Sequence, residues 1–572
     1  MRNSSSDRRS LFLIAVLVTA ACFLFTYLYY GFFYVEYEGM FDSFYSGHLT
    51  GGLPFRSVYF LGNIGTSHLY SLLYQAYPGV EWVSWFLYSY LFLSCLLAVY
   101  IILSVVAEIS GAGIGAVIAA LVYFLVMADS NIHFLFTRVS YMLVGSSLLG
   151  LVYFFGAAGS IRRQPGLFIL LCSGFAIGTL TRSESATAVL LQVFVFGFLY
   201  IKRIRQLISV FLFPVLFLGV VLAAIAYDLS TTPYFYKQVE PDIEAQFTDR
   251  ENAVPLSQMH SHRDTVRWEA VKNIIWVDPP VLTPSYMRSL ILPERPLYTD
   301  ARQWSRVARV MTNIAGRYWY LCVISWLLSL ALLIRRRPQS AWYLLQWLVF
   351  AASFWVLIAV QTYTDKVNDR SFLPLLSIFI LAQLIAALPA LLTQRRMIVV
   401  ALPVLTLSMI HLSRLSAEAD TLRGYRGAYQ STLATISHVA GGKVLVVNSS
   451  SCDYLFLSNE PFHPFDFSAF HRIYITDGFN IPFLPYYRRY LEQECHCDMA
   501  AFPSFWDYLR SRHQKVVIVS TPQHLSILRS YMEAEHHYIL PISADTGTAL
   551  MTLQKSDARD ITDSLQIYHL GQ

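Results

Sequence analysis

The sequence LFLIAVLVTAACFLFTYLYY (Leu11–Tyr30) is followed, after a short link, by YVEYEGMFDSFYSGHLTGG (Tyr34–Gly52). The first stretch is predicted to cross a membrane, because roughly 20 apolar residues span the hydrocarbon core of a bilayer. The second stretch places three carboxylates, Glu36, Glu38 and Asp42, at the membrane face. Carboxylates at such a position are costly to desolvate and usually serve chemistry, ion handling or pairing. The two stretches together predict a membrane protein with an acidic site at one face.

The composition extends this prediction to most of the chain. Of the 572 residues, 55% are hydrophobic and 14% are charged, whereas soluble domains carry about 25% charged residues. We therefore expect a polytopic α-helical membrane protein. Met1 to Arg9 is polar and basic, and no small-residue cleavage site follows Tyr30, so the first span is interpreted as a signal anchor.

Hydropathy predicts about eleven transmembrane helices. They lie near residues 11–31, 82–107, 111–128, 137–158, 166–181, 185–201, 206–227, 317–334, 341–361, 371–393 and 397–412. These positions predict a transmembrane domain over residues 1–412, with outer loops 32–81 and 228–316, and a second domain over residues 413–572.

The charges between the spans predict the orientation. One set of alternate connections is basic and contains Arg8–Arg9, Arg162–Arg163, Lys202–Arg205, Arg335–Arg337 and Arg395–Arg396. The other set contains the acidic first loop, Asp129, Glu184, the long loop 229–315, Asp365, Asp369 and the C-terminal domain. Because basic connections stay in the cytoplasm, the N-terminus is expected inside and the C-terminal domain outside.

The C-terminal region reads as a small α/β domain. The stretches Gly442 to Asn448 and Lys515 to Ser520 are predicted to be buried strands of a parallel sheet. Helical patterns near 425–439, 504–512 and 522–535 flank them. An exported domain permits a disulfide among Cys452, Cys495 and Cys497, whereas this spacing is poor for zinc.

The long outer loop contains one further helical pattern. Trp268, Val271 and Ile275 recur at helical spacing before Asp278-Pro-Pro ends the segment. The pattern predicts an amphipathic helix on the membrane surface.

Four polar clusters are expected to meet at the outer membrane face. Basic side chains beside acidic ones suit a phosphate-bearing lipid donor, because Arg binds phosphate oxygens bidentately and Lys adds a point charge. A carboxylate in the same cavity can act as general base on an acceptor hydroxyl. The clusters are Glu36, Glu38 and Asp42; Thr181 to Glu184, with Arg182; Arg250, His260, His262, Arg263 and Arg267; and Asp365 to Arg370, with Lys366.

Each cluster also has a purely structural interpretation. The acids of the first loop can be solvated, and Arg182 can pair with Glu184 or with Glu38. Lys366 and Arg370 can anchor a helix end at the membrane interface.

The chain resembles the GT-C superfamily of integral-membrane glycosyltransferases, which use polyprenyl-phosphate-linked sugars. The resemblance covers about the first 400 residues: an N-in helix, a long outer loop with acids directly after it, and many spans. Several local patterns resemble a bacterial subgroup, namely Glu38 with Ser46-Gly47 and Gly51-Gly52, Leu72-Leu-Tyr74, Tyr77-Pro-Gly79, Arg182-Ser-Glu184 and Arg370-Ser-Phe-Leu-Pro374.

The resemblance implies roles for individual residues. Glu38 would be the catalytic base, with Glu36 and Asp42 as alternatives, because the subgroup often has an Asp-Asp pair where this chain has Glu-Tyr-Glu. The substrate-binding residues would be Arg182, Glu184, Arg263, Arg267, Lys366 and Arg370. No certain cofactor is implied, and a divalent metal stays open.

The resulting expectation is a bacterial inner-membrane glycosyltransferase that moves a hexose or pentose on the periplasmic side. The donor would be a polyprenyl-phosphate-linked sugar and the acceptor a glycan, lipid or protein; no nucleic acid is expected as a partner. One alternative is an O-antigen ligase or polymerase, which would rely on Arg263, Arg267 and His262. The other is a transporter or flippase for a lipid-linked glycan, which should show an internal repeat and charges near the bilayer midplane.

Overall fold

The computed structural model describes most of the chain. Nothing is stated below about the structure of any other residue. The described residues are 5–34, 66–77, 80–156, 164–201, 203–231, 253–273, 281–292, 301–335, 341–364, 369–394, 398–447, 462, 472–475, 502–512, 515–540, 542, 548–554 and 562–569.

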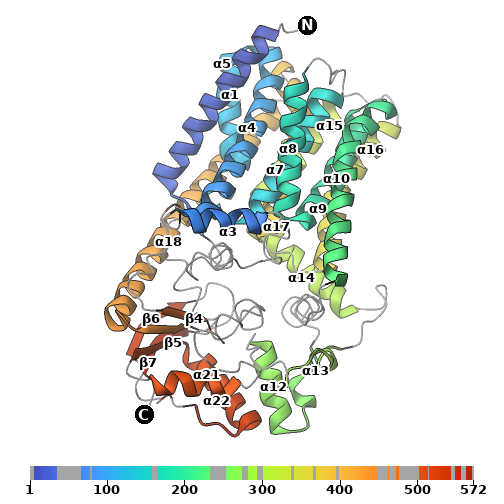
Figure 1. Ribbon diagram of the computed structural model, residues 1–572. Helices are drawn as coiled ribbons and strands as arrows, with labels where there is room; N and C mark the ends of the chain where they lie inside the picture. The colour runs from blue at the N-terminus through green and yellow to red at the C-terminus, as the bar shows by residue number, and fades with distance from the viewer. Residues whose placement is uncertain are drawn as a thin grey trace.

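A bundle of long apolar helices forms the larger part of the molecule (Figure 1). Because no water reaches the hydrocarbon core of a bilayer, a spanning segment must satisfy its backbone groups internally, as an α-helix does. The helices are α1 (Ser5–Phe25, continued by the π-helical turn η1, Thr26–Tyr30), α4 (Trp82–Ser110), α5 (Ala112–Val126), α7 (Phe136–Gly156), α8 (Pro165–Thr181), α9 (Ser183–Tyr200), α10 (Ile204–Thr231), α15 (Trp319–Arg335), α16 (Ala341–Thr364), α17 (Asp369–Thr393) and α18 (Ile398–Ala440).

Each of the predicted spans coincides with one of these helices. Among the described residues, eight helices are long and apolar enough to cross a membrane. A ninth span counts if α15 is joined to α14 (Ala301–Arg317), from which it is bent by 87°. The remaining two predicted spans are the shorter apolar helices α5 and α8. The predicted polytopic helical fold is therefore confirmed.

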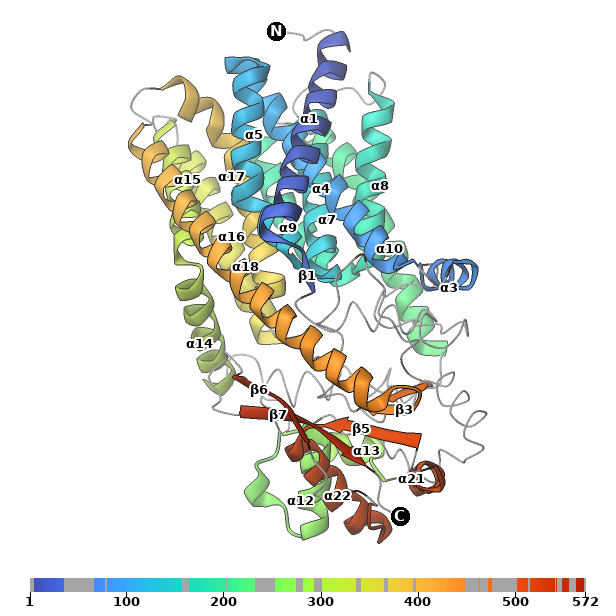
Figure 2. The ribbon, with the colours of Figure 1, turned by 90° about the vertical axis from the view of Figure 1, so that its left-hand side faces the viewer.

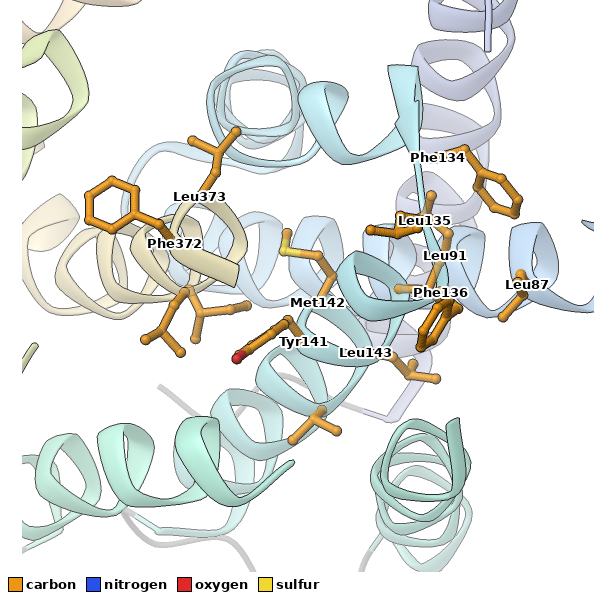
Figure 3. Packing of buried hydrophobic residues seen from close by; sticks show 14 of the residues in the cluster. Leu87, Leu91, Phe134, Leu135, Phe136, Tyr141, Met142, Leu143, Phe372 and Leu373 are labelled. Carbon is orange, nitrogen blue, oxygen red and sulfur yellow. The ribbon is translucent and has the colours of Figure 1, made fainter. Parts of the chain in front are cut away.

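The core of the bundle lies around α4, α7 and α17, whose residues are mostly buried, whereas α1 and α10 expose one face. Figure 3 shows this interior, with Leu87 and Leu91 of α4 beside the start of α7. Phe372 and Leu373 of α17 lie near Tyr141 and Met142 in the same view. The shorter helix α3 (Thr66–Ala76) lies at the lower end of the bundle in Figure 1, and α6 (Ala128–Ile132) lies between α5 and α7 in the chain.

The C-terminal region contains a five-stranded sheet in the order β4-β3-β5-β7-β6. Its strands are β3 (Val444–Val447), β4 (Arg472–Ile475), β5 (Val516–Ser520), β6 (Thr548–Gln554) and β7 (Thr562–His569). Strand β3 pairs in parallel with β4 and β5, so the predicted parallel strands are confirmed. Strand β7 joins β5 in the antiparallel sense and β6 follows it, which makes the sheet mixed. The predicted helices near 504–512 and 522–535 are α21 (Phe502–Ser511) and α22 (Pro522–His536).

The structure differs from the sequence prediction at helix α18, where one helix replaces two separate predicted ones. The predicted span 397–412 and the predicted helix 425–439 belong to one continuous helix of 43 residues. Pro403, Gly424 and Gly427 lie within it, and these residues are tolerated at a cost when tertiary contacts support the helix. The helix runs along the bundle and continues obliquely to β3 (Figure 2).

The long outer loop contains α12 (His262–Lys272) and α13 (Pro284–Ser289). Val266, Trp268 and Val271 of α12 are buried, and α12 packs against α22. Figure 1 shows α12 beside α22, at the end of the molecule opposite the N-terminus. The predicted position on the membrane surface is therefore wrong, because the apolar face of α12 is covered by the C-terminal region. Ile275 lies outside the described residues.

The contact between α7 and α8 depends on Gly178. A methyl group placed on Gly178 would lie 2.7 Å from Val144 Cγ2 and 3.2 Å from the Val144 backbone nitrogen. Such overpacking costs about 1–3 kcal/mol. We expect Gly178→Ala to lower the thermal unfolding midpoint of the purified protein. The control is Gly219→Ala on α10, where nothing lies within 4 Å of the added methyl group; equal midpoints for the two variants would contradict this packing.

Candidate functional site

The first outer loop departs from a short strand at the lower end of the bundle. Strand β1 (Phe33–Tyr34) pairs in parallel with β2 (His133–Phe134), with Phe33 opposite His133. The first described segment of the chain ends at Tyr34, two residues before Glu36. Glu36, Glu38 and Asp42 themselves lie outside the described residues. The surroundings of β1 and β2 are therefore the part of the candidate site that the structure places.

A chain of buried charges lies beside this strand pair. His133 Nδ1 is 2.8 Å from Asp129 Oδ1, and Arg138 Nη1 donates to Asp129 Oδ2. The three side chains come from β2, α6 and the start of α7, and each is at most 10% exposed. Two cations thus surround one carboxylate that solvent hardly reaches.

Helix α18 extends the chain of charges toward solvent. Glu418 Oε1 lies 3.3 Å from His133 Nε2, at ion-pair distance, and 3.7 Å from Arg317 Nη2 at the end of α14. The Glu418 side chain is 40% exposed. The series Arg138, Asp129, His133, Glu418 and Arg317 therefore alternates in charge from the interior to the surface, where Glu418 of α18 and Arg317 of α14 are accessible.

The charges set the protonation of Asp129 and His133. Burial acts to raise the pKa of Asp129, but Arg138 and His133 outweigh it and hold the pKa well below the ordinary value. Burial acts to lower the pKa of His133, but Asp129 and Glu418 raise it to about 9. His133 is therefore a cation at neutral pH, which balances the two carboxylates on either side of it.

Asp129, His133 and Glu418 are close enough together to be considered as ligands of a metal ion. One ligand atom each from Asp129, His133 and Glu418 lies within 4.8 Å of the others. A metal-binding imidazole must be neutral and offer a free nitrogen lone pair. Here both ring nitrogens of His133 face carboxylates, and Asp129 Oδ2 is bound to Arg138. We therefore interpret the group as an ion-pair chain.

The cluster around Arg182 lies next to the ion-pair chain, at the start of α7. Arg182 Nη1 donates to Thr137 Oγ1 at 2.6 Å, and its guanidinium lies 5.4 Å from the centre of the Phe136 ring. Thr137 directly precedes Arg138. Arg182 Nε is 3.7 Å from Glu184 Oε2, so these two residues form the surface pair that their spacing permitted. Glu184 is 76% exposed.

The fourth cluster is only partly described. Lys366 lies outside the described residues. Arg370 lies in the first turn of α17, two residues before Phe372. The Phe372 ring stacks with Tyr318, the residue after Arg317, at a centroid distance of 6.0 Å. The start of α17 thus lies close to the outer end of the ion-pair chain.

Arg263 and Arg267 are bound elsewhere. Arg263 donates to both carboxylate oxygens of Glu535 on α22, with bonds of 2.7–2.9 Å. Arg267 donates to the same two oxygens at 2.7 and 2.8 Å. The Glu535 side chain is fully buried beneath them. The two arginines therefore attach α12 to α22, and these two helices lie at the end of the molecule away from α8 and α9, between which Arg182 lies (Figure 1).

The sequence also contains a signal for the residues that surround Asp129. The charge pattern places Asp129 at the outer face, but it indicates no partner for it. On α18, His411, Arg414, Glu418 and Arg426 recur every three, four or eight residues, which places them along one side of a helix. A polar stripe directly after an apolar span predicts a helix side that faces buried charge.

The chain was compared with known protein families, proteins and structures for similarity of sequence and fold. No protein-family model matches the sequence, and no curated protein matches it. The apo crystal structure of ArnT from Cupriavidus metallidurans matches with a TM-score of 0.50 and 13% identity, over 96% of this chain and 97% of ArnT. ArnT bound to undecaprenyl phosphate matches with a TM-score of 0.40 and 12% identity, over 99% and 98%. The apo structure shows that this chain has the fold of ArnT.

The buried charge at Asp129 generates a stability prediction. Asp129→Asn leaves Arg138 and His133 without their shared carboxylate, and breaking a buried ion pair from one side costs about 3–5 kcal/mol. We expect a clear drop in the unfolding midpoint of the purified protein. Glu108→Gln, at an exposed position on α4, is the control and should leave the midpoint unchanged. A midpoint for Asp129→Asn equal to that of the control would refute the ion-pair chain.

The attachment of α12 generates a pH prediction. Burial acts to raise the pKa of Glu535, but Arg267 and Arg263 outweigh it and lower the pKa. Because the pKa of Glu535 is lower in the folded than in the unfolded protein, its charge stabilises the attachment fully at any pH above the unfolded glutamate pKa of about 4.3. This stabilisation is lost as the pH falls through the lower, folded-state pKa. Amide exchange of residues 262–272, corrected for the intrinsic pH dependence, should therefore stay slow at pH 5 and speed up only in stronger acid.

Two variants check the cause of that behaviour. Glu535→Gln should release α12 at neutral pH, whereas Glu533→Gln, exposed on the same helix, should not. Release of α12 in the unmodified protein between pH 7 and pH 5 would show that another group controls the attachment.

Proposed function

We propose that the chain is a membrane glycosyltransferase of the GT-C type that uses a lipid-linked sugar donor. The observation that carries the proposal is the fold, which matches that of ArnT over 96% of this chain and 97% of ArnT. The proposal places the protein in the inner membrane of a bacterium, with a cytoplasmic N-terminus and transfer on the periplasmic side. The basic connections between the spans support this orientation.

The donor proposed is a sugar linked to a polyprenyl phosphate. ArnT has been solved with undecaprenyl phosphate bound, which makes this carrier the first to test. Arginine and lysine side chains at the outer face support a phosphate-bearing donor. The acceptor would be a hydroxyl of an envelope glycan, lipid or protein.

The transfer would invert the anomeric centre in one displacement. A carboxylate takes the proton of the acceptor hydroxyl while its oxygen forms a bond to the anomeric carbon of the sugar. The bond from that carbon to the phosphate oxygen breaks, and the electron pair leaves with the polyprenyl phosphate. The protein must hold both partners in line and stabilise the charge that develops on the leaving phosphate.

The proposed roles follow the sequence expectation with one change. Glu38 is the base, with Glu36 and Asp42 as alternatives, and Lys366 and Arg370 contact the donor phosphate. Arg182, held by Thr137 and adjoining Glu184, shapes the cavity. Arg263 and Arg267 are reassigned to attachment of α12, because Glu535 already occupies their guanidinium groups. This reassignment also disfavours the ligase alternative, which required these arginines at the donor.

The function is tested by comparing envelope glycans and lipid-linked sugars in cells that carry wild type or Glu38→Gln at equal protein level. We expect Glu38→Gln to lose one sugar from the envelope and to accumulate its carrier-linked donor, since an amide cannot accept the proton. Glu36→Gln and Asp42→Asn follow the same protocol, and Glu533→Gln is the control. If all three loop variants match wild type, catalysis at this loop is excluded and the transporter alternative takes its place.

A further inference from the structure

The chain leaves the first span through an unusual helix end. Helix α1 closes with the π-helical turn η1, after which Gly31 adopts φ +87° and turns the backbone toward β1. The last carbonyl groups of any helix have no partner within the helix and carry partial negative charge. In this chain these carbonyls lie directly before the loop with the proposed catalytic carboxylates.

Two arginines of α18 bind that helix end. Arg423 Nη2 donates to the carbonyl oxygens of Tyr29 and Tyr30, the second at 3.2 Å. Arg426 Nη2 donates to the carbonyl oxygen of Phe32, and its guanidinium lies 4.2 Å from the centre of the Phe33 ring. Arg423 Nη1 also binds Asp420 on the same helix, which orients the guanidinium.

Helix α18 thereby holds both strands of the short pair. Arg426 donates to the Phe32 carbonyl directly before β1 and lies over the Phe33 ring of β1, and Glu418 pairs with His133 of β2. Residues eight positions apart lie on the same side of an α-helix. One side of one helix therefore fixes the place from which the first loop departs, three residues before Glu36.

From this arrangement we propose that Arg423 and Arg426 are positioning residues for the transfer reaction. They hold the backbone of residues 29–33, and thereby the entry into the carboxylate loop, without touching the substrate. The proposal rests on the proposed function, because it requires that the carboxylates of this loop take part in catalysis.

The test uses the full-length protein in lipid nanodiscs, with Arg423→Met and Arg426→Met alone and together. The matched control is Arg512→Met in the C-terminal region, because Arg512 also lies over an aromatic ring, 4.7 Å from the centre of Tyr508. The first readout is amide exchange of residues 29–34, with residues 262–272 as an internal reference. The second is sugar transfer from an undecaprenyl-phosphate-linked donor, with kcat and the donor KM measured separately.

For the double variant we expect amide exchange of residues 29–34 to rise about tenfold or more, while residues 262–272 exchange as in wild type. We expect kcat to fall about tenfold or more and the donor KM to change less than about threefold, because a misplaced base affects the transition state rather than donor binding. Arg423→Lys and Arg426→Lys keep a cationic donor and should restore most of kcat, and the control should match wild type.

Three outcomes overturn the proposal. Unchanged exchange of residues 29–34 shows that the arginines do not hold this backbone. Faster exchange with unchanged kcat shows that its position does not matter for transfer. A raised donor KM with unchanged kcat shows that the arginines bind the donor phosphate directly. Absence of transfer by the wild-type protein refutes the proposed function itself, a result that differs from all three.

Discussion

The end of the helical bundle that faces the C-terminal sheet depends on one buried negative charge, that of Asp129. A charge without access to water costs several kcal/mol unless it is paired and hydrogen-bonded. Arg138 and His133 provide that pairing, and the imidazolium of His133 then faces Glu418 on α18. The requirement to neutralise one carboxylate thereby joins α6, β2 and α7 to a helix from a distant part of the sequence.

This junction is what connects the two halves of the molecule. Above it lie the apolar helices of the bundle, and below it lie the sheet and α12 (Figure 1). Helix α18 reaches from one half to the other, and the ion pairs of Glu535 add α12 to the lower half. In the proposed function, this connection would join a half that a lipid-linked donor approaches to a half that faces the acceptor.

The elements that the sequence predicted correctly are those whose signal is local. Apolar runs of about 20 residues predict spans, and the valine-rich runs at 444–447 and 516–519 are continuously apolar and of strand length. The pairings of charge could not be predicted in this way, since Arg263 and Glu535 are 272 residues apart. The prediction that α12 lies on the membrane surface was wrong for a related reason. The apolar residues Trp268 and Val271 indicate that one face of the helix is covered, but not whether lipid or protein covers it. Glu36, Glu38 and Asp42 remain predictions from the sequence.

The continuity of α18 also constrains how this protein can change in length. Each residue of an α-helix adds about 1.5 Å of rise and 100° of rotation. A single insertion between Arg426, the last of these contacts with the bundle, and Ala440 would therefore turn the sheet by more than a quarter of a revolution relative to the bundle. Insertions of seven residues, close to two whole turns, would preserve the helical phase and only lift the sheet. In this segment, length variation among relatives should occur in whole turns, whereas the loops accept any number.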